Sequence, residues 1–171
     1  FGTSGARACV IDAAGRPVFD DRRDFGALAE HERAAVWREA LWDLVAGLPP
    51  AIRSQLDSLA IDGTSGTIVA CDEALTPRAP PLLYDDARAA DEAARIARLA
   101  PAGHPAAAVT SGLAKALWLQ KRLGLTGARI YLNQADWLAG LLTGQAGHTD
   151  YHNALKLGLD LCVPIEKRTF G

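Results

Sequence analysis

The pattern of apolar and polar positions predicts strands and helices in alternation. Two strand-like stretches, Ala6–Asp12 and Pro17–Arg22, flank a short turn in which Gly15 permits the reversal, so we expect a β-hairpin. In Glu30–Gly47 the apolar residues fall on one face at helical spacing, and the stretch stops at Gly47 and Pro49. The first part of the chain therefore predicts an antiparallel ribbon followed by a helix.

The middle of the chain predicts a return to the sheet. Leu59–Ile61 is short and apolar and predicts a buried strand, and Thr67–Cys71 predicts another strand that ends at a turn over Asp72–Ala74. The proline-rich stretch Pro77–Pro81 breaks regular structure, so no helix is expected before Leu82. The chain is thus expected to enter the sheet, leave it and enter it again.

Helical patterns dominate the rest of the chain. They predict one helix over Asp91–Leu99 and a second from a cap at Thr110 or Ser111 through Leu123. A third is expected over Gln134–Thr143, with Asn133 and Asp136 as a capping pair. A fourth is expected over Asp150–Leu157, after Thr149. Gly124, Gly127, Gly144 and Gly158 are the expected ends of the last three. Asp160–Gly171 shows no clear periodicity, and we leave residues 161–171 as an unassigned tail.

Composition and charge narrow the class of protein. The chain has 171 residues, of which 49% are hydrophobic, and this favours one compact α/β domain. A net charge of −2 provides no basic field for nucleic acid. No apolar run approaches the roughly 20 residues that a membrane helix needs, and the N-terminus lacks signal-peptide features. We therefore expect a soluble cytoplasmic protein without a nucleic-acid or membrane partner.

Cysteine, tryptophan and histidine add little chemistry. The cysteines are odd in number and widely spaced, which favours buried free thiols over disulfides or a metal site: Cys9, Cys71 and Cys162. The tryptophans lie at helical spacing, which favours core packing: Trp37, Trp42, Trp118 and Trp137. Three histidines have no metal-like spacing with cysteine or acidic residues: His104, His148 and His152. We therefore predict no metal ligand among them.

The tetrapeptide GTSG occurs twice, at Gly2–Gly5 and at Gly63–Gly66, each time before a strand-like stretch. Glycine lets the backbone approach a ligand, and the hydroxyls add donors for phosphate or sugar oxygens. Arg7, five residues past Gly2, could meet a phosphate bidentately, and Asp62 adds a carboxylate before the second copy. A surface turn and an exposed strand arginine are the alternative interpretation. If functional, the two copies predict two polar ligands.

These motifs together resemble the FGGY family of sugar kinases, over nearly everything from Phe1 to about Asp160. FGTSGAR resembles the family's first phosphate motif, and IDGTSGT occupies the place of its sugar-contact loop. LLYDDAR at Leu82–Arg88 is similar to its WxDxR-like segment. Neighbouring side chains of an extended segment point to opposite sides, so only one of Asp85 and Asp86 should face a site. SGLAKALWL, QADWLAGLLTG and DYHNALKLGLD resemble the small D-ribulose and D-xylulose kinase branch.

The resemblance implies an α/β, actin-like ATPase (ribonuclease-H-like) fold, with a mixed five-stranded sheet flanked by helices. Residues 1–160 would form the N-terminal domain of a two-domain kinase. ATP and Mg²⁺ would bind in the cleft between it and a C-terminal domain that this chain lacks. The γ-phosphoryl group would pass to a ketopentose, D-ribulose in the first place, to give D-ribulose 5-phosphate.

The resemblance also implies site residues. Those serving the nucleotide phosphates would be Gly2, Thr3, Ser4, Gly5 and Arg7. Those orienting the sugar or lining its pocket would be Thr64, Ser65, Tyr84, Asp86 and Ser111. No metal ligand is assigned.

Two of the family's acidic residues would fall outside the chain. One directly precedes the first motif, before Phe1, and the catalytic-base aspartate would lie beyond Gly171. We therefore expect no catalytic residue here, and an inactive chain that is part of an enzyme. D-xylulose, glycerol or another polyol stays open as the substrate, and so does a non-catalytic module that only binds a sugar or nucleotide.

Overall fold

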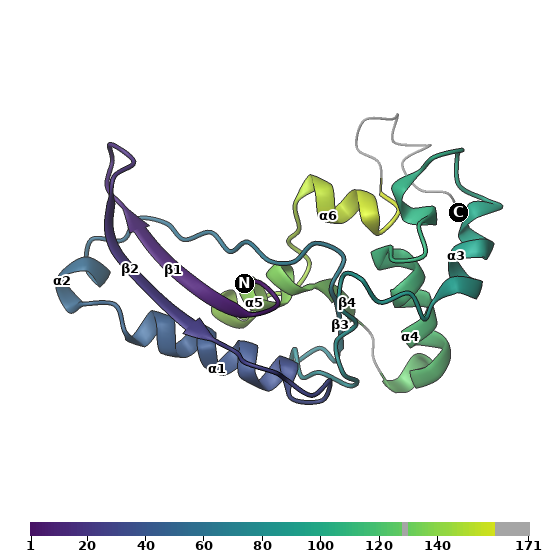
Figure 1. Cartoon of the computed structure of the whole chain (residues 1–171), viewed down its shortest axis with the longest axis horizontal. Helices are drawn as coiled ribbons and strands as arrows, with labels where there is room; N and C mark the ends of the chain where they lie inside the picture. Colours follow the sequence, from purple (N-terminus) through teal and green to yellow (C-terminus); the bar gives the residue numbers. More distant parts are fainter. Residues whose placement is uncertain (128–129, 160–171) are drawn as a thin grey trace.

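A computed structural model describes residues 1–127 and 130–159. These residues form two antiparallel two-stranded sheets surrounded by helices (Figure 1). The elements in chain order are β1 (Gly5–Ile11), β2 (Pro17–Asp24), α1 (Arg33–Ala46), α2 (Pro50–Arg53), β3 (Ile68–Cys71), α3 (Ala90–Ala97), the 3₁₀ helix η1 (Pro105–Ala107), α4 (Gly112–Gly127), β4 (Ile130–Asn133), α5 (Gln134–Thr143) and α6 (Tyr151–Lys156). No helix of the described residues is long and apolar enough to cross a membrane.

The predicted hairpin is confirmed as β1 and β2, which reverse at Gly15 with a φ of 76°. Its two faces differ because side chains alternate along each strand. Ala6 is buried toward α1, whereas Arg7 and its cross-strand partner Arg22 face outward and are exposed. The ribbon therefore packs on the predicted helix α1 with one face and presents charges on the other.

Strand β3 lies at the centre of the molecule, and all four of its residues are buried (Figure 1). Val69 and Cys71 belong to the cluster that packs on α1 and α5, whereas Ile68 and Ala70 pack with Leu119 of α4. A strand covered on both faces is apolar at every position, which explains why Thr67–Cys71 lacks alternation. Burial also raises the pKa of the Cys71 thiol to about 11.

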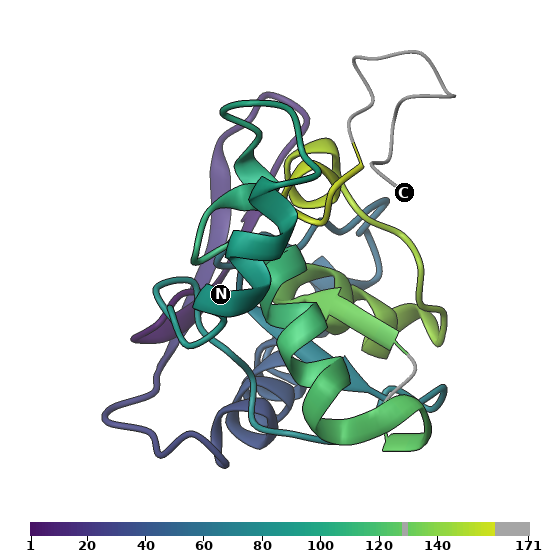
Figure 2. The same cartoon turned by 90° about the vertical axis from the view of Figure 1, so that its right-hand side faces the viewer.

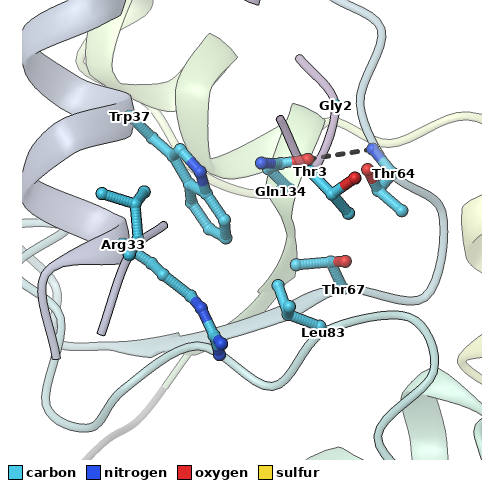
Figure 3. Close-up of a pocket in the computed structure, with 9 residues that line it drawn as sticks. Gly2, Thr3, Arg33, Trp37, Thr64, Thr67, Leu83 and Gln134 are labelled. Carbon is cyan, nitrogen blue, oxygen red and sulfur yellow. Dashed lines mark hydrogen bonds between the residues drawn. The ribbon is translucent and has the colours of Figure 1, made fainter. Parts of the chain in front are cut away.

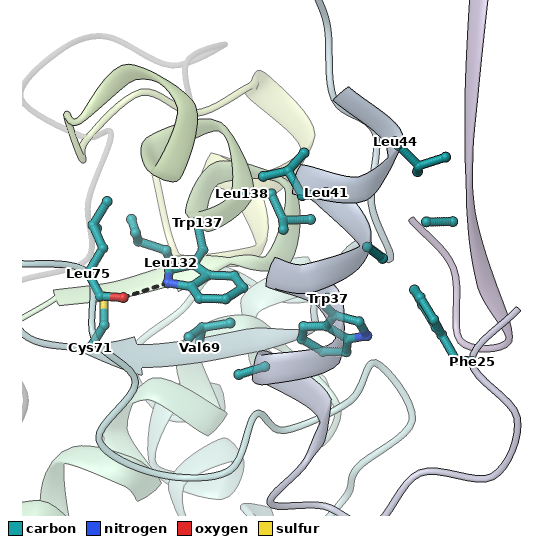
Figure 4. Packing of buried hydrophobic residues seen from close by; sticks show 13 residues of the cluster. Phe25, Trp37, Leu41, Leu44, Val69, Cys71, Leu75, Leu132, Trp137 and Leu138 are labelled. Atoms are coloured by element: carbon teal, nitrogen blue, oxygen red, sulfur yellow. Dashed lines mark hydrogen bonds between the residues drawn. The ribbon is translucent and has the colours of Figure 1, made fainter. Parts of the chain in front are cut away.

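The main core joins α1, α5 and β3 (Figure 4). Trp37 and Trp137 are 2% and 1% exposed, and the indole nitrogen of Trp137 donates a hydrogen bond to the carbonyl of Leu75 at 2.9 Å. Gly140 of α5 allows close packing here, because a Cβ would lie 3.0 Å from the Leu75 side chain and 3.2 Å from the Gln145 carbonyl. These contacts pack the middle of α5 against Leu75, which follows β3 in the chain.

Helices α3 and α4 form a second layer on the other face of β3, and Figure 2 shows them side by side. Ser111 is the N-cap of α4, as predicted: its hydroxyl accepts a hydrogen bond from the Ala114 amide at 3.1 Å. Leu119 faces inward, and Lys121 and Arg122 face outward, as expected. The helical conformation breaks at Gly124, whose φ is 67°.

The prediction of a buried strand at Leu59–Ile61 is wrong. These residues form no strand, and Leu59 is 56% exposed. Both edges of β3 are already occupied, one by β4 and the other by the Pro77–Leu82 segment, where Ile68 and Leu82 exchange backbone hydrogen bonds and the Ala70 carbonyl accepts from the Arg78 amide. The expected single five-stranded sheet therefore appears as two separate pairs in the described residues.

Several smaller expectations also need correction. Cys9 is exposed on the outer face of β1, and Cys162 lies outside the described residues. Trp42 is 42% exposed because it lies five residues from the buried Trp37, on another side of α1.

The N-cap of α6 is Asp150, whose carboxylate accepts a hydrogen bond from the backbone amide of Asn153. Thr149 is not the cap, because its hydroxyl donates to Asp136. Strand β4 follows the glycine-rich end of α4 and was not predicted.

Candidate functional site

The two GTSG turns lie against each other in the folded chain. The backbone nitrogen of Phe1 donates a hydrogen bond to the carbonyl of Asp62 at 2.8 Å. A cavity of about 100 Å³ opens between them (Figure 3), lined by Gly2, Thr3, Leu28, Arg33, Trp37, Thr64, Thr67, Leu83 and Gln134. Two motifs 61 residues apart in the sequence thus share one cavity.

The first turn is a tight loop at the open end of the hairpin. The Gly2 amide donates to the carbonyl of Gly5 and the Phe25 amide to that of Ser4, both at 2.9 Å. A Cβ on Gly5 would lie 2.6 Å from the carbonyl oxygen of Arg23, so this glycine is needed for strand pairing. Thr3 and Ser4 are exposed, which leaves their hydroxyls accessible to a ligand.

A second, larger cavity of about 510 Å³ borders the first turn on the outer face of the hairpin. Arg7 lines it, but its guanidinium is paired with Asp20, with Nε 2.7 Å from a carboxylate oxygen. Arg22 is paired through Nη2 with Asp24 of the same strand. The Arg7 hydrogen bond lowers the pKa of Asp20 below its usual range. The cavity wall therefore carries two guanidinium groups, each already neutralised by a carboxylate.

The second turn is anchored by α5 and α6. The Thr64 amide donates to Oε1 of Gln134 at 2.9 Å, and the Ser65 hydroxyl donates to Oδ1 of Asn153 at 3.0 Å. Gly63 packs so closely on α5 that a Cβ would lie 3.0 Å from the Ala135 amide nitrogen. The position of this loop is thus decided by the N-terminal ends of two helices distant in sequence.

Thr67 places a polar atom on the wall of the smaller cavity. The residue is fully buried, and its hydroxyl has no hydrogen-bond partner among the described residues (Figure 3). A buried hydroxyl without a partner is uncommon, because its desolvation is then uncompensated. Thr67 could hydrogen-bond a polar molecule that enters the cavity.

The Leu82–Arg88 segment borders the same region through Leu83. Asp86 is half-buried and accepts hydrogen bonds from the amide and Nε of Arg88 at 3.0 and 2.9 Å, while Asp85 is exposed. Arg88 also reaches Glu30 at 2.8 Å. Tyr84 is 47% exposed. Asp86 is therefore held in a fixed orientation by its neighbour.

Ser111 lies deeper than expected for a residue that lines a pocket. It is 3% exposed, and its hydroxyl donates to the carbonyl of Ala106 at 2.7 Å in addition to capping α4. Its only proton is thus used inside the chain. The structure gives Ser111 a role at the start of the helix.

Comparison with known structures identifies the fold. No protein-family model matches the chain. A xylulose kinase from Rhodospirillum rubrum is similar over 94% of this chain and 37% of its own, with a TM-score of 0.75 and 19% identity. Plasmodium falciparum glycerol kinase with ADP matches over 99% and 38%, with a TM-score of 0.71 and 16% identity. The chain has a sugar-kinase fold.

A third neighbour agrees, a xyloylose kinase from Brucella ovis with a TM-score of 0.65 and 22% identity over 81% of this chain and 32% of its own. The resemblance to FGGY-type carbohydrate kinases and the expected fold class are thus confirmed at the level of the fold. The sugar-kinase fold of this chain spans about a third of each neighbour's length, with 37%, 38% and 32% covered.

The residues of the first turn suit a phosphate group better than a bare metal ion. The exposed Ser4 borders the larger cavity and the exposed Thr3 lines the smaller one, and the hydroxyl of each can donate to phosphate oxygens. Among residues 1–127 and 130–159, no group of three or more histidine, cysteine or acidic side chains could hold a metal ion. Mg²⁺ at nucleotide sites is bound by one or two carboxylates plus phosphates, so here it would depend on the nucleotide's own oxygens.

Sequence reasoning missed four residues that shape this site: Thr67, Lys115, Gln134 and Asn153. Gln134 and Asn153 anchor the second turn only because the chain folds back on itself, and nothing local signals this. Lys115 did carry a signal. It lies four residues from the capping Ser111 and from the inward-facing Leu119, and so on the buried face of α4.

Proposed function

We propose that this chain is part of an ATP-dependent carbohydrate kinase that phosphorylates a ketopentose, with D-ribulose as the preferred acceptor. The observation that carries the proposal is the cavity shared by the two GTSG turns, which brings Thr3 and Thr64 to one site. In this proposal the first turn serves ATP phosphates and the second orients the sugar. The sugar-kinase fold supports this assignment.

Phosphoryl transfer needs positioning and neutralisation of charge more than covalent chemistry by the protein. Thr3, Ser4 and the Gly5 turn would bind phosphate oxygens, and Arg7 would exchange Asp20 for phosphate as its partner. Mg²⁺ would neutralise the phosphates. Cytoplasmic ATP and an open-chain sugar are then the required small molecules, and a further domain would supply the catalytic base.

The sugar would contact the second turn. Thr64 lines the shared cavity, and the unpartnered hydroxyl of Thr67 lies at its wall. Ser65 keeps oxygen lone pairs free while its proton is donated to Asn153, so it can still accept from a sugar hydroxyl. Tyr84 and Asp86 would contact the sugar from the neighbouring Leu82–Arg88 segment. Ser111 would contribute indirectly, by capping α4.

D-xylulose and glycerol are the competing acceptors, because the structural neighbours include a xylulose kinase and a glycerol kinase. A panel of D-ribulose, D-xylulose and glycerol on the complete enzyme, with sugar-dependent ADP release as the measurement, separates them. We expect the highest kcat/KM for D-ribulose. A preference for glycerol would overturn the ketopentose assignment, and binding without ADP release on any sugar would favour a non-catalytic module.

Ser65→Ala tests the sugar contact. Loss of one hydrogen bond to an uncharged hydroxyl costs about 0.5–1.5 kcal/mol, so kcat/KM for the ketopentose should fall several-fold while the KM for ATP stays the same. Asn153→Ala is the matched control, because it removes the acceptor of the Ser65 proton and keeps the Ser65 hydroxyl. Equal losses in both variants would mean that Ser65 only anchors the loop.

A further inference from the structure

Lys115 is a fully buried lysine in the middle of the molecule, with 0% of its surface exposed. Helix α4 places it one turn after the Ser111 cap, since the Lys115 amide donates to the Ser111 carbonyl at 3.2 Å. Buried lysines are rare because the ammonium group must be desolvated. The fold therefore has to compensate this charge with specific partners.

Those partners are two backbone carbonyls from different loops. Nζ of Lys115 donates to the carbonyl of Gly66, at the end of the second GTSG turn, at 2.8 Å. It also donates to the carbonyl of Tyr84, in the Leu82–Arg88 segment, at 3.1 Å. Hydrogen bonds from a charged donor are stronger than neutral ones. One side chain thus joins the two segments that border the cavity.

Two parts of the fold, the Leu82–Arg88 segment and α6, carry the charged groups that act on Lys115. Asp85 and Asp86 of the loop favour its charged form, and Lys156 of α6 disfavours it. The carboxylate of Glu92 in α3 lies 3.7 Å from Nζ of Lys121, a different lysine of α4. Burial has the largest effect and lowers the pKa of Lys115 to about 8, so the group is mainly charged at neutral pH.

We propose that Lys115 is a positioning residue that fixes the second GTSG turn relative to the Leu82–Arg88 segment, so that both present their polar groups to the sugar. The part that concerns the sugar rests on the proposed function; the connection between the two loops does not. The Lys115 hydrogen bond meets the second turn at its last residue, Gly66, which has a φ of 82° and leads directly into the buried Thr67. ATP, held by the first turn, should depend on it much less.

Lys115→Met tests the proposal, because methionine keeps most of the side-chain length and removes the donors. Lys121→Met is the matched control on the same helix, since the side chain of Lys121 is 71% exposed. In hydrogen exchange without substrate, residues 63–67 and 82–87 should exchange at least tenfold faster in Lys115→Met, and as in wild type in Lys121→Met. Unchanged exchange in both loops would overturn the proposal.

Kinetics of the complete enzyme supply the second readout. We expect the KM for the sugar to rise tenfold or more in Lys115→Met, with the KM for ATP within twofold of wild type. Equal rises in both would indicate general damage and overturn the positioning role. If the enzyme turns over no sugar at all, the proposed function fails, and the exchange experiment still decides whether Lys115 joins the loops.

Wild-type protein provides a test if Lys115→Met does not fold. Deprotonation above about pH 8 removes the charge that strengthens both hydrogen bonds, so exchange in the two loops should accelerate between pH 7 and 9 beyond the intrinsic increase. Amides of α1 serve as the internal reference. Identical pH dependence in the loops and in α1 would overturn the proposal.

Discussion

At the scale of single residues, the charge pairs on the outer face of the hairpin decide what the first GTSG motif can do. Arg7 and Arg22 line the same cavity, and each has a carboxylate partner. If Arg7 exchanges Asp20 for phosphate, Arg7→Ala in the complete enzyme should raise the KM for ATP several-fold and change the KM for the sugar little. Steady-state kinetics with each substrate varied in turn measures this.

Arg22→Ala is the control for Arg7, because it removes an equally exposed guanidinium from the same face. We expect a smaller effect on ATP, since Arg7 lies two residues from Gly5 along the chain, whereas its cross-strand partner Arg22 belongs to the other strand of the hairpin. Unchanged ATP kinetics in Arg7→Ala would leave Arg7 as an exposed strand arginine. Equal effects of both substitutions would point to a general charge effect.

At the scale of elements, Ser111 shows how one cap supports a whole helix. Its hydroxyl bonds the Ala114 amide and the Ala106 carbonyl, so Ser111→Ala should destabilise the fold by about 1 kcal/mol. In a domain of this size that lowers Tm by roughly 2–4 °C, measured by thermal unfolding. Ser54→Ala, which removes one exposed hydrogen bond to Ala51, should change Tm little. Unchanged stability with a raised KM for the sugar would instead support direct contact.

At the scale of the whole molecule, the part of the kinase fold that this chain spans limits what it can catalyse by itself. Its fold spans 37% of the xylulose kinase neighbour, and phosphoryl-transfer sites close around their substrates to exclude water. We predict that residues 1–171 alone show no sugar-dependent ADP release. The complete enzyme under the same conditions is the control, and turnover by the isolated chain would contradict the two-domain proposal.

Local sequence determined the elements whose causes are local. The hairpin, α1 and α5 were predictable because a turn glycine, helical spacing and a terminal Gly144 act within a few residues. The two GTSG motifs were visible for the same reason. Strand β4 was missed because it is only four residues long and becomes a strand only beside β3.

Only the tertiary structure decided how these parts meet. Leu59–Ile61 looked like a strand, but both edges of β3 are occupied, and strand pairing depends on which edges remain free. The anchors of the second turn, Asn153 and Lys115, lie 88 and 49 residues from their partners. Local propensity carries no information about such distances. The sequence by itself therefore determined the motifs and most elements, whereas folding decided that both motifs line one cavity and that a buried lysine joins its loops.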